Sequence, residues 1–155
     1  MEEVPAQRDG FSDQGTSSMI GVGHRAVPHT ARFEAWAPSR DQCLAEAVLA
    51  LVEGFADTTQ ASISGETQIW IDPADDDDQL ARLLSEIIRR LHADSVLPVD
   101  LEISEPQNDG LDVRLAVVSL SRVRLTGPLP EEILLPEVSM RRLGGLWHAT
   151  FAVAV

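Results

Sequence analysis

The sequence contains no lysine and no tyrosine, and its only cysteine is Cys43. A single cysteine excludes an internal disulfide and a zinc site built from four cysteines. No stretch reaches the about 18 uninterrupted apolar residues that a membrane-spanning helix needs, so we expect no membrane association. The chain begins Met-Glu-Glu and continues without an apolar core, which argues against a secretory signal peptide. We therefore expect a cytoplasmic protein.

The signatures of common enzyme classes are also missing. The sequence has no Gly-x-Ser-x-Gly nucleophile elbow, no phosphate-binding P-loop, no His-Glu-x-x-His zinc motif and no dinucleotide-binding glycine fingerprint. Cys43 has no motif around it, so we interpret it as a small packing residue and not as a nucleophile. These absences predict a protein that is not an enzyme.

Positive charge is scarce, because 12 basic residues, all arginine, stand against 25 acidic ones and give a formal net charge of −13 at pH 7. Such a charge argues against direct binding to nucleic acid, since sequence-independent affinity comes mainly from neutralising phosphates. An acidic surface suits a protein partner with a basic face. The alternative is that the charge only keeps the protein soluble.

The residues that are present are sufficient for one folded domain. At 155 residues, of which 44% are hydrophobic, the chain can bury about two-thirds of its unfolded surface without a disulfide or a metal. Residues 1–18 are polar, show no apolar period and predict a disordered N-terminal leader. The folded domain is therefore predicted to span residues 19–155.

The spacing of apolar residues predicts the order of the secondary structure. Apolar residues separated by three and four predict two amphipathic helices, the first capped by Ser39 and ending near Gly54, the second following an acidic run and ending near His92. Two helices among these strands predict an α+β fold of two layers, with both helices on one face of a mostly antiparallel sheet. Alternating segments predict strands at residues 32–37, 67–71, 99–103, 111–120 and 147–155, with residues 122–125 extending the sheet as an edge.

Four consecutive aspartates, Asp75 to Asp78, begin the second predicted helix. Several carboxylates suit calcium or magnesium, but this run lacks the alternating ligands and the turn glycine of an EF-hand loop. Acidic residues at a helix N-terminus also cap free amides and oppose the macrodipole, which is worth about 0.3–1 kcal/mol for each residue. We favour the capping role and keep cation binding as the alternative.

His24 and His29 lie five residues apart, just before the first predicted strand. Two imidazoles in one segment can share a metal ion or a proton. A loop histidine that hydrogen-bonds to the backbone is the commoner arrangement. A small hydrolase that uses these histidines and nearby acids therefore remains an alternative function.

The segment from His24 to Phe55 resembles the opening of archeases, in which a His-Thr-Ala-Asp motif leads into a strand and then a helix. Residues 29–31 match the first three positions of this motif. The acidic start of the second helix at 75–92 and the final strand continue the similarity over most of residues 20–155. The resemblance implies an archease-like fold and a small accessory protein.

Archeases, the resemblance implies, assist the RNA ligase that joins 2′,3′-cyclic-phosphate and 5′-hydroxyl ends in tRNA splicing and RNA repair. They promote guanylylation and repeated turnover of that ligase. The alternative is a repurposed protein-binding or chaperone module, for example one that serves a tRNA methyltransferase. His24, His29 and Arg32 are the candidate partner-binding residues in this sequence.

The sequence departs from the family at the residues that hold a divalent cation there. The aspartate that closes the motif is matched by Arg32, and a second aspartate near the C-terminus is matched by Ala154. A guanidinium repels a cation, and alanine offers only a backbone carbonyl. The resemblance therefore implies a protein without bound metal or other cofactor. Arg32 is predicted to supply the missing positive charge by pairing with a carboxylate or a phosphate.

Overall fold

The computed structural model describes residues 21–27, 31–106 and 109–155, and the leader predicted at residues 1–18 lies outside them. Its elements are β1 (Gly23–Val27), β2 (Arg32–Ala37), α1 (Arg40–Glu53), β3 (Ala56–Asp57), β4 (Gly65–Ile71), α2 (Asp76–Asp94), β5 (Val96–Ser104), β6 (Leu111–Ser119), β7 (Arg124–Leu125), β8 (Glu132–Ile133), β9 (Ser139–Leu143) and β10 (Leu146–Ala154). Two short 3-10 helices, η2 (Leu120–Arg122) and η3 (Leu135–Glu137), follow β6 and β8.

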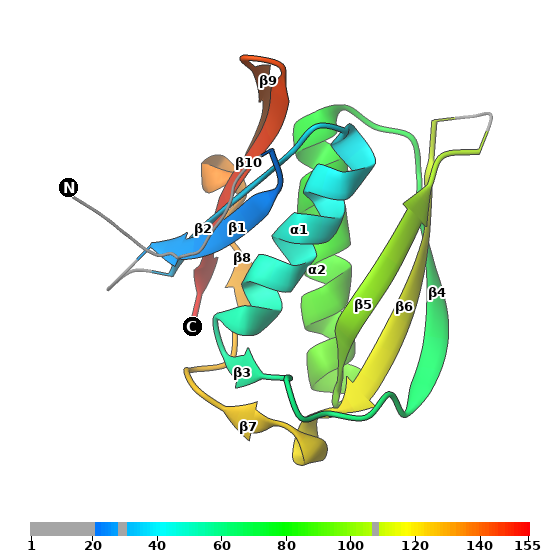
Figure 1. Cartoon of the computed structure of the whole chain (residues 1–155), viewed down its shortest axis with the longest axis vertical. Coiled ribbons are helices and arrows are strands. Elements are labelled where there is room, and N and C mark those ends of the chain that lie inside the picture. Colours follow the sequence, from blue (N-terminus) through cyan, green and yellow to red (C-terminus); the bar gives the residue numbers. More distant parts are fainter. Residues whose placement is uncertain (1–20, 28–30, 107–108) are drawn as a thin grey trace.

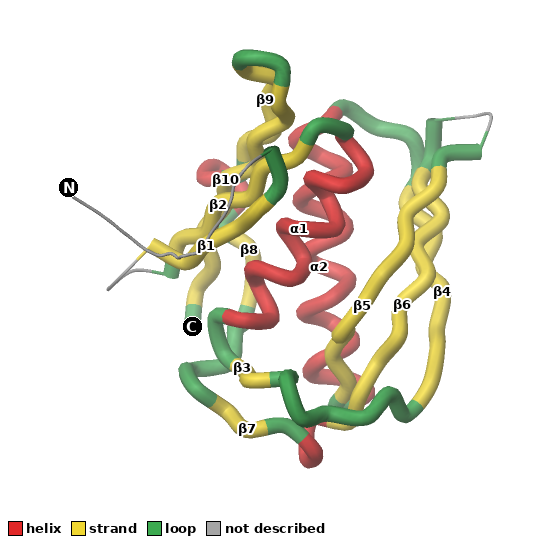
Figure 2. Tube along the Cα trace, in the orientation of Figure 1, coloured by secondary structure: helices red, strands yellow, loops and turns green. Residues whose placement is uncertain are grey.

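Two sheets enclose the two helices, which lie side by side between them (Figures 1 and 2). The first sheet has the order β1-β2-β10-β8, with β9 also pairing with β10, and the second has the order β4-β6-β5. Every strand pair that the structure describes is antiparallel. The α+β class with two helices and antiparallel strands is confirmed, and the strands are divided between two sheets instead of forming one.

The burial pattern of α1 explains why a second sheet is needed. A helix that packs on one sheet buries a single stripe of residues spaced by three and four. The residues that α1 buries extend beyond one stripe, so the helix must be covered from more than one side. They are Cys43, Leu44, Ala47, Val48, Ala50, Leu51 and Val52.

Both helices begin at the caps that the sequence predicts. The Ser39 hydroxyl accepts the backbone N–H of Gln42 at 3.1 Å, ahead of α1. The Asp75 carboxylate accepts the backbone N–H of Asp78 at 2.9 Å, ahead of α2. The capping role of the acidic run is therefore confirmed.

The prediction that residues 122–125 extend the main sheet is wrong. After β6 the chain enters η2, whose N-cap is Ser119 and whose last residue is Arg122. This turn directs the chain away from β6, so that β7 pairs with β3 in a separate two-stranded ribbon through Ala56 and Leu125. The ribbon lies below the helices in Figure 1.

The core between the sheets is closely packed and includes the single cysteine. The rings of Phe33 and Phe151 stack with their centroids 5.1 Å apart. Cys43 is fully buried, and burial, together with the charge of Glu46, raises the pKa of its thiol to about 12. The packing role predicted for Cys43 is confirmed. No helix in the described ranges combines the length and apolar character needed to cross a bilayer.

Candidate functional site

Arg32 and Ala154 lie on the same face of the first sheet. Side chains of paired residues in an antiparallel sheet point to one side, and successive residues alternate between sides. Phe33 pairs with Phe151, and both face the helices, so Arg32 and its partner Ala152 face outward. Ala154 is two residues beyond Ala152 and shares that outer face. The fold therefore brings together two positions that are 122 residues apart in the sequence.

Arg32 forms an ion pair on this outer face with Glu137, the last residue of η3. The Arg32 side chain is 54% exposed and that of Glu137 is 37% exposed, so the pair stays in contact with water. Backbone hydrogen bonds hold the main chain at both partners. The N–H of Glu137 donates to the carbonyl of Leu134 at 2.9 Å, and the N–H of Val153 donates to the carbonyl of Ala31, the residue before Arg32, at 3.0 Å. The predicted pairing of Arg32 with a carboxylate is present.

His24 lies on the opposite face of the same sheet, because it pairs with the buried Ala35. Its Nδ1 is 2.7 Å from Glu46 and its Nε2 is 3.0 Å from Glu53, both on α1. Burial alone would lower the pKa of His24, but the hydrogen bonds and charges of the two glutamates outweigh it and raise the pKa to about 9. His24 is therefore a charged link between β1 and α1 at neutral pH.

The three residues proposed from the sequence thus do not form one cluster. His24 faces the helices, Arg32 faces solvent, and His29 lies outside the described residues. A general base must be neutral to accept a proton, and His24 is held in its charged form by two carboxylates. This arrangement argues against the hydrolase alternative as far as His24 is concerned.

Known proteins resemble this chain in both sequence and fold. The model of the archease protein family (MTH1598/TM1083) matches residues 24–127. This chain belongs to the archease family. A relative from Mycobacterium tuberculosis named "Probable protein archease" is 42% identical over 144 residues, which cover 91% of this chain and 77% of the relative, and the CDC 1551 / Oshkosh and H37Rv strains give the same match.

Solved structures of two proteins share the fold. A Thermotoga maritima crystal structure, titled as an archease and possible chaperone (TM1083), has a TM-score of 0.59 and 16% identity, covering 92% of this chain and 99% of that one. The solution structure of Methanobacterium thermoautotrophicum protein 1598 has a TM-score of 0.63 and 19% identity, covering 88% and 100%. At these identities the likeness establishes the archease fold.

The outer face of this archease does not fit the divalent cation that the family resemblance implies. Arg32 already neutralises Glu137, and Ala154 has no side-chain oxygen. Cations of this kind require several oxygen ligands and are repelled by a guanidinium. In the described part of the chain, no three His, Cys, Asp or Glu residues gather in a way that could hold a metal ion.

A polar network that the sequence did not predict joins the N-terminal ends of the two helices. Arg40 of α1 lies 2.6 Å from Asp76 of α2 and 3.5 Å from Glu105, and it also donates to Gln79. Gln79 is completely buried. No sequence pattern indicates this network, because its members come from three separate segments that only the tertiary fold brings together.

Asp41 lies beside this network and has an altered proton affinity. Burial raises its pKa, the neighbouring Glu105 raises it further and Arg40 opposes both, so that the pKa is about 7. Within the described residues, one carboxyl oxygen of Asp41 is buried without a hydrogen-bond partner. A proton shared with Glu105 satisfies such a pair better than two negative charges do.

Proposed function

We propose that this archease is a non-enzymatic accessory protein for the RNA ligase that joins 2′,3′-cyclic-phosphate and 5′-hydroxyl ends. In this proposal the ion pair between Arg32 and Glu137 takes the place of the cation implied by the family resemblance. The observation that carries the proposal is this pair, which lies on an exposed face at one of the positions matched to the family's aspartates.

The chemistry of the guanidinium supports this role. Arg32 has five N–H donors in a planar fork, and its ion pair with Glu137 leaves the side chain 54% exposed. The remaining donors are therefore available to a carboxylate or a phosphate of the partner. A fixed, partly paired guanidinium thus offers positive charge where a bound cation would otherwise supply it, without a metal or other cofactor.

The partner in this proposal is a protein in the cytoplasm, and direct binding to nucleic acid is not part of it. The support is the net charge of −13, which opposes contact with phosphate backbones. His24 remains a candidate contact residue only at its exposed edge, because two glutamates of α1 occupy both ring nitrogens. Arg32 is therefore the first residue to test.

The decisive experiment measures turnover of ligase guanylylation with and without the protein, first with divalent cation present and then after the archease has been freed of cation by chelation. Stimulation should survive that treatment of the archease. It should fall in the Arg32→Ala variant, while Arg25→Ala serves as the matched control. Arg25 of β1 is also in an ion pair, at 3.1 Å from Glu34 of β2, and β2 separates β1 from β10 in the sheet.

Two further variants separate charge from position. Exchanging the partners in Arg32→Glu/Glu137→Arg keeps the ion pair and should retain part of the stimulation. The double variant Arg32→Asp/Ala154→Asp restores both family aspartates and should gain cation binding, which calorimetry detects independently of the ligase. Equal stimulation by Arg32→Ala and wild type would contradict the proposed role of the ion pair.

A second partner class is suggested by the Thermotoga maritima archease, which is described as a "possible chaperone". Under this reading the same outer face binds another protein, for example a tRNA methyltransferase, and maintains its solubility. Two results together would favour this second function over the first. The folded protein would fail to stimulate the ligase, and it would suppress aggregation of the methyltransferase as measured by light scattering.

A further inference from the structure

The strand β4 forms an open edge of the three-stranded sheet. Its seven residues pair with β6 in an unbroken register from Gly65 opposite Val117 to Ile71 opposite Leu111. Native edge strands are commonly protected by proline, by a bulge or by a covering segment. The other edge strand, β5, has a proline and a register shift after Pro98, whereas β4 has neither. Its outward backbone groups are therefore suited to pairing with another strand.

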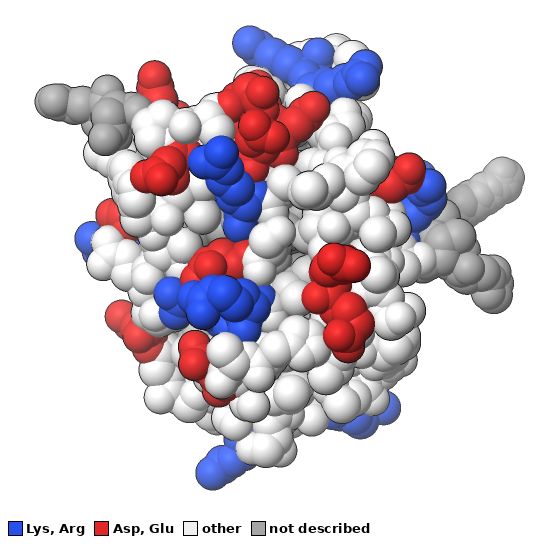
Figure 3. All heavy atoms as spheres, turned by 180° about the vertical axis from the view of Figure 1, so that it is seen from behind, with Lys and Arg blue, Asp and Glu red and all other residues white. Residues whose placement is uncertain are grey.

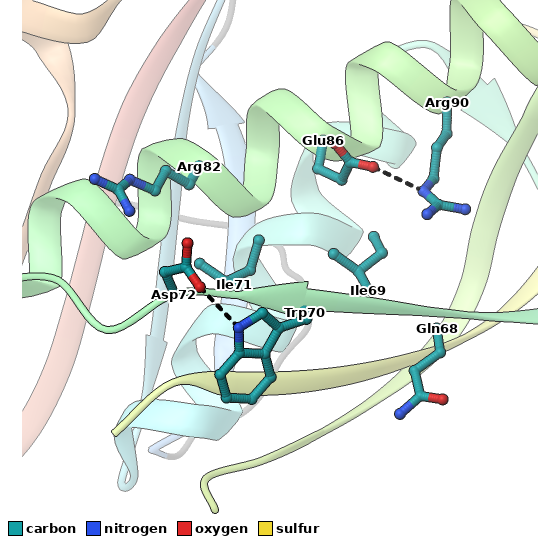
Figure 4. Close-up of a pocket in the computed structure, with 8 residues that line it drawn as sticks. All are labelled: Gln68, Ile69, Trp70, Ile71, Asp72, Arg82, Glu86 and Arg90. Atoms are coloured by element: carbon teal, nitrogen blue, oxygen red, sulfur yellow. Dashed lines mark hydrogen bonds and ion pairs between the residues drawn. The ribbon is translucent and has the colours of Figure 1, made fainter. Parts of the chain in front are cut away.

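A cavity of about 480 Å³ runs along this edge, between β4 and the exposed side of α2 (Figure 4). Arg82, Glu86 and Arg90 project from the helix. On the strand, Ile69 and Ile71 point toward the helix and Trp70 points to the opposite face of the sheet. Arg90 is held by Glu86 at 3.1 Å and by Thr67 at 3.0 Å. Arg82 is exposed and makes no ion pair within the described residues.

The indole ring of Trp70, which lines the cavity, is held in place by its neighbours. The indole N–H of Trp70 donates to Asp72 at 2.8 Å, and the ring lies so close over Gly110 that a Cβ added there would be 2.3 Å away. The Trp70 side chain is nevertheless 46% exposed. The lining therefore carries two arginines and two acids, Glu86 and Asp72, with Arg82 as the arginine that has no ion pair within the described residues, and it includes an exposed indole on the strand.

The spacing of the two arginines specifies what an added strand would carry. Arg82 and Arg90 are eight residues apart, which corresponds to about 12 Å along a helix. A strand advances by about 3.3 Å per residue, so that distance spans about four residues on the same face. Glu86 lies midway between the two arginines and disfavours an acid at the intermediate position.

We propose that the β4 edge is a docking site for an extended acidic segment of a partner protein, which adds a strand to the three-stranded sheet. Carboxylates of this segment, four residues apart, face Arg82 and Arg90, and apolar residues on the alternate face contact Trp70. Strand addition of this kind draws its affinity from backbone hydrogen bonds and its specificity from the alternate side chains.

The net negative charge of the chain does not oppose this contact strongly. On the side opposite to the view of Figure 1, acidic and basic side chains form small clusters, several of which touch one another, with uncharged surface around them (Figure 3). Charges separated by more than about 8 Å are largely screened at physiological salt. Distant acids are therefore screened, and within the cavity Glu86 is paired with Arg90, which leaves Arg82 as the arginine that a docked carboxylate can neutralise.

The test is an amide-resolved NMR titration of the full chain with a capped synthetic peptide as long as β4, seven residues. The peptide carries glutamate at its second and sixth positions, threonine at the fourth and valine at the others. Shifts should centre on β4 and on α2 from Arg82 to Arg90. A peptide methylated on the backbone nitrogens of one edge should not bind, because it cannot complete the strand pairing.

Charge exchange gives the sharper test. Arg82→Glu should weaken binding of the glutamate peptide about fivefold and should strengthen binding of a matched lysine peptide. Arg142→Glu is the control, because Arg142 is also exposed but lies on β9 of the other sheet. Equal effects of the two variants, or no shifts at millimolar peptide, would overturn the proposal.

A second copy of the chain is the competing occupant of this edge. Without peptide, the NMR signals of β4 would then shift as the protein concentration rises, and the protein would diffuse more slowly. That result would assign the edge to self-association and overturn the proposal. The inference does not depend on the ligase role, since the titration contains neither ligase nor RNA.

Discussion

The two sheets that enclose the helices differ in how their strands are covered. In β10 of the first sheet three consecutive residues, Phe151, Ala152 and Val153, are all buried, because the helices cover one face and η3 lies against the other. In β4 of the second sheet burial alternates, with Ile69 and Ile71 inside and Trp70 exposed between them. Burial in β10 therefore extends to both faces of the strand, whereas β4 buries one face and leaves the other open to solvent.

The largest difference between the sheets should be seen when an aromatic ring is removed from each. Phe151→Ala removes a ring that is 1% exposed and stacked on Phe33, and it should lower the free energy of unfolding by about 3–5 kcal/mol. Trp70→Ala removes a ring that is 46% exposed and should cost less than about 1 kcal/mol. Urea denaturation of both variants measures the difference, and equal losses would contradict it.

His24 should give the next largest effect, and its size should depend on pH. His24→Gln removes the charged link between the first sheet and α1, and it should cost about 1–2 kcal/mol at pH 6, because the side chain is 17% exposed and its two partners are acidic. The folded-state pKa of about 9 is above the ordinary value of 6.5. The stabilisation is therefore complete below pH 6.5 and is lost as the pH rises through 9.

The measurement is the difference in unfolding free energy between wild type and His24→Gln from pH 5 to pH 10. His92→Gln is the control, because the partner of His92 among the described residues is the carbonyl of Pro130 and not a carboxylate. A constant difference across this range would show that His24 acts through packing and not through its charge.

Asp41 should show a smaller effect with a pH window of its own. Its folded-state pKa of about 7 is raised from 3.8, so the folded state binds the proton more tightly than the unfolded state does. Stability therefore falls as the pH rises from about 4 to about 7. Asp41→Asn mimics the protonated acid and should stabilise the protein above pH 7 by about 0.5–1 kcal/mol, after allowance for screening by solvent.

Thermal unfolding of Asp41→Asn and wild type at pH 5 and pH 8 tests this expectation. The two proteins should be closer in stability at pH 5, where both side chains are uncharged in the folded state, and the variant should be the more stable of the two at pH 8. A variant that is less stable at pH 8 would show that the ionised carboxylate is useful to the fold.

The smallest effect on stability should come from the ion pair proposed to matter for function. Arg32→Ala should cost about 0–1 kcal/mol, because Arg32 is 54% exposed and surface ion pairs contribute little. Chemical denaturation should show this small change, while ligase stimulation shows a large one. A loss of several kcal/mol would instead make the pair a structural brace of the first sheet.

The sequence predicted the features that depend on near neighbours. Ser39 and Asp75 cap their helices within three residues of their own positions, and the strand at Arg32–Ala37 follows from simple alternation. The division into two sheets was not predictable from such patterns, since it depends on how α1 is covered. The site was predicted only in part, because Glu137 reaches Arg32 through the pairing of β10 with β2 and the position of η3.

The buried cysteine makes the protein suitable for labelling at a chosen point. Cys43 is inaccessible, and its thiol is protonated at any working pH, so thiol reagents should leave the folded wild type unmodified. A cysteine introduced at Leu143 of β9 or at Ile63 ahead of β4, 56% and 59% exposed, would be the only reactive one. Two singly labelled proteins, each carrying a dye beside a different sheet, would report separately which side a partner approaches.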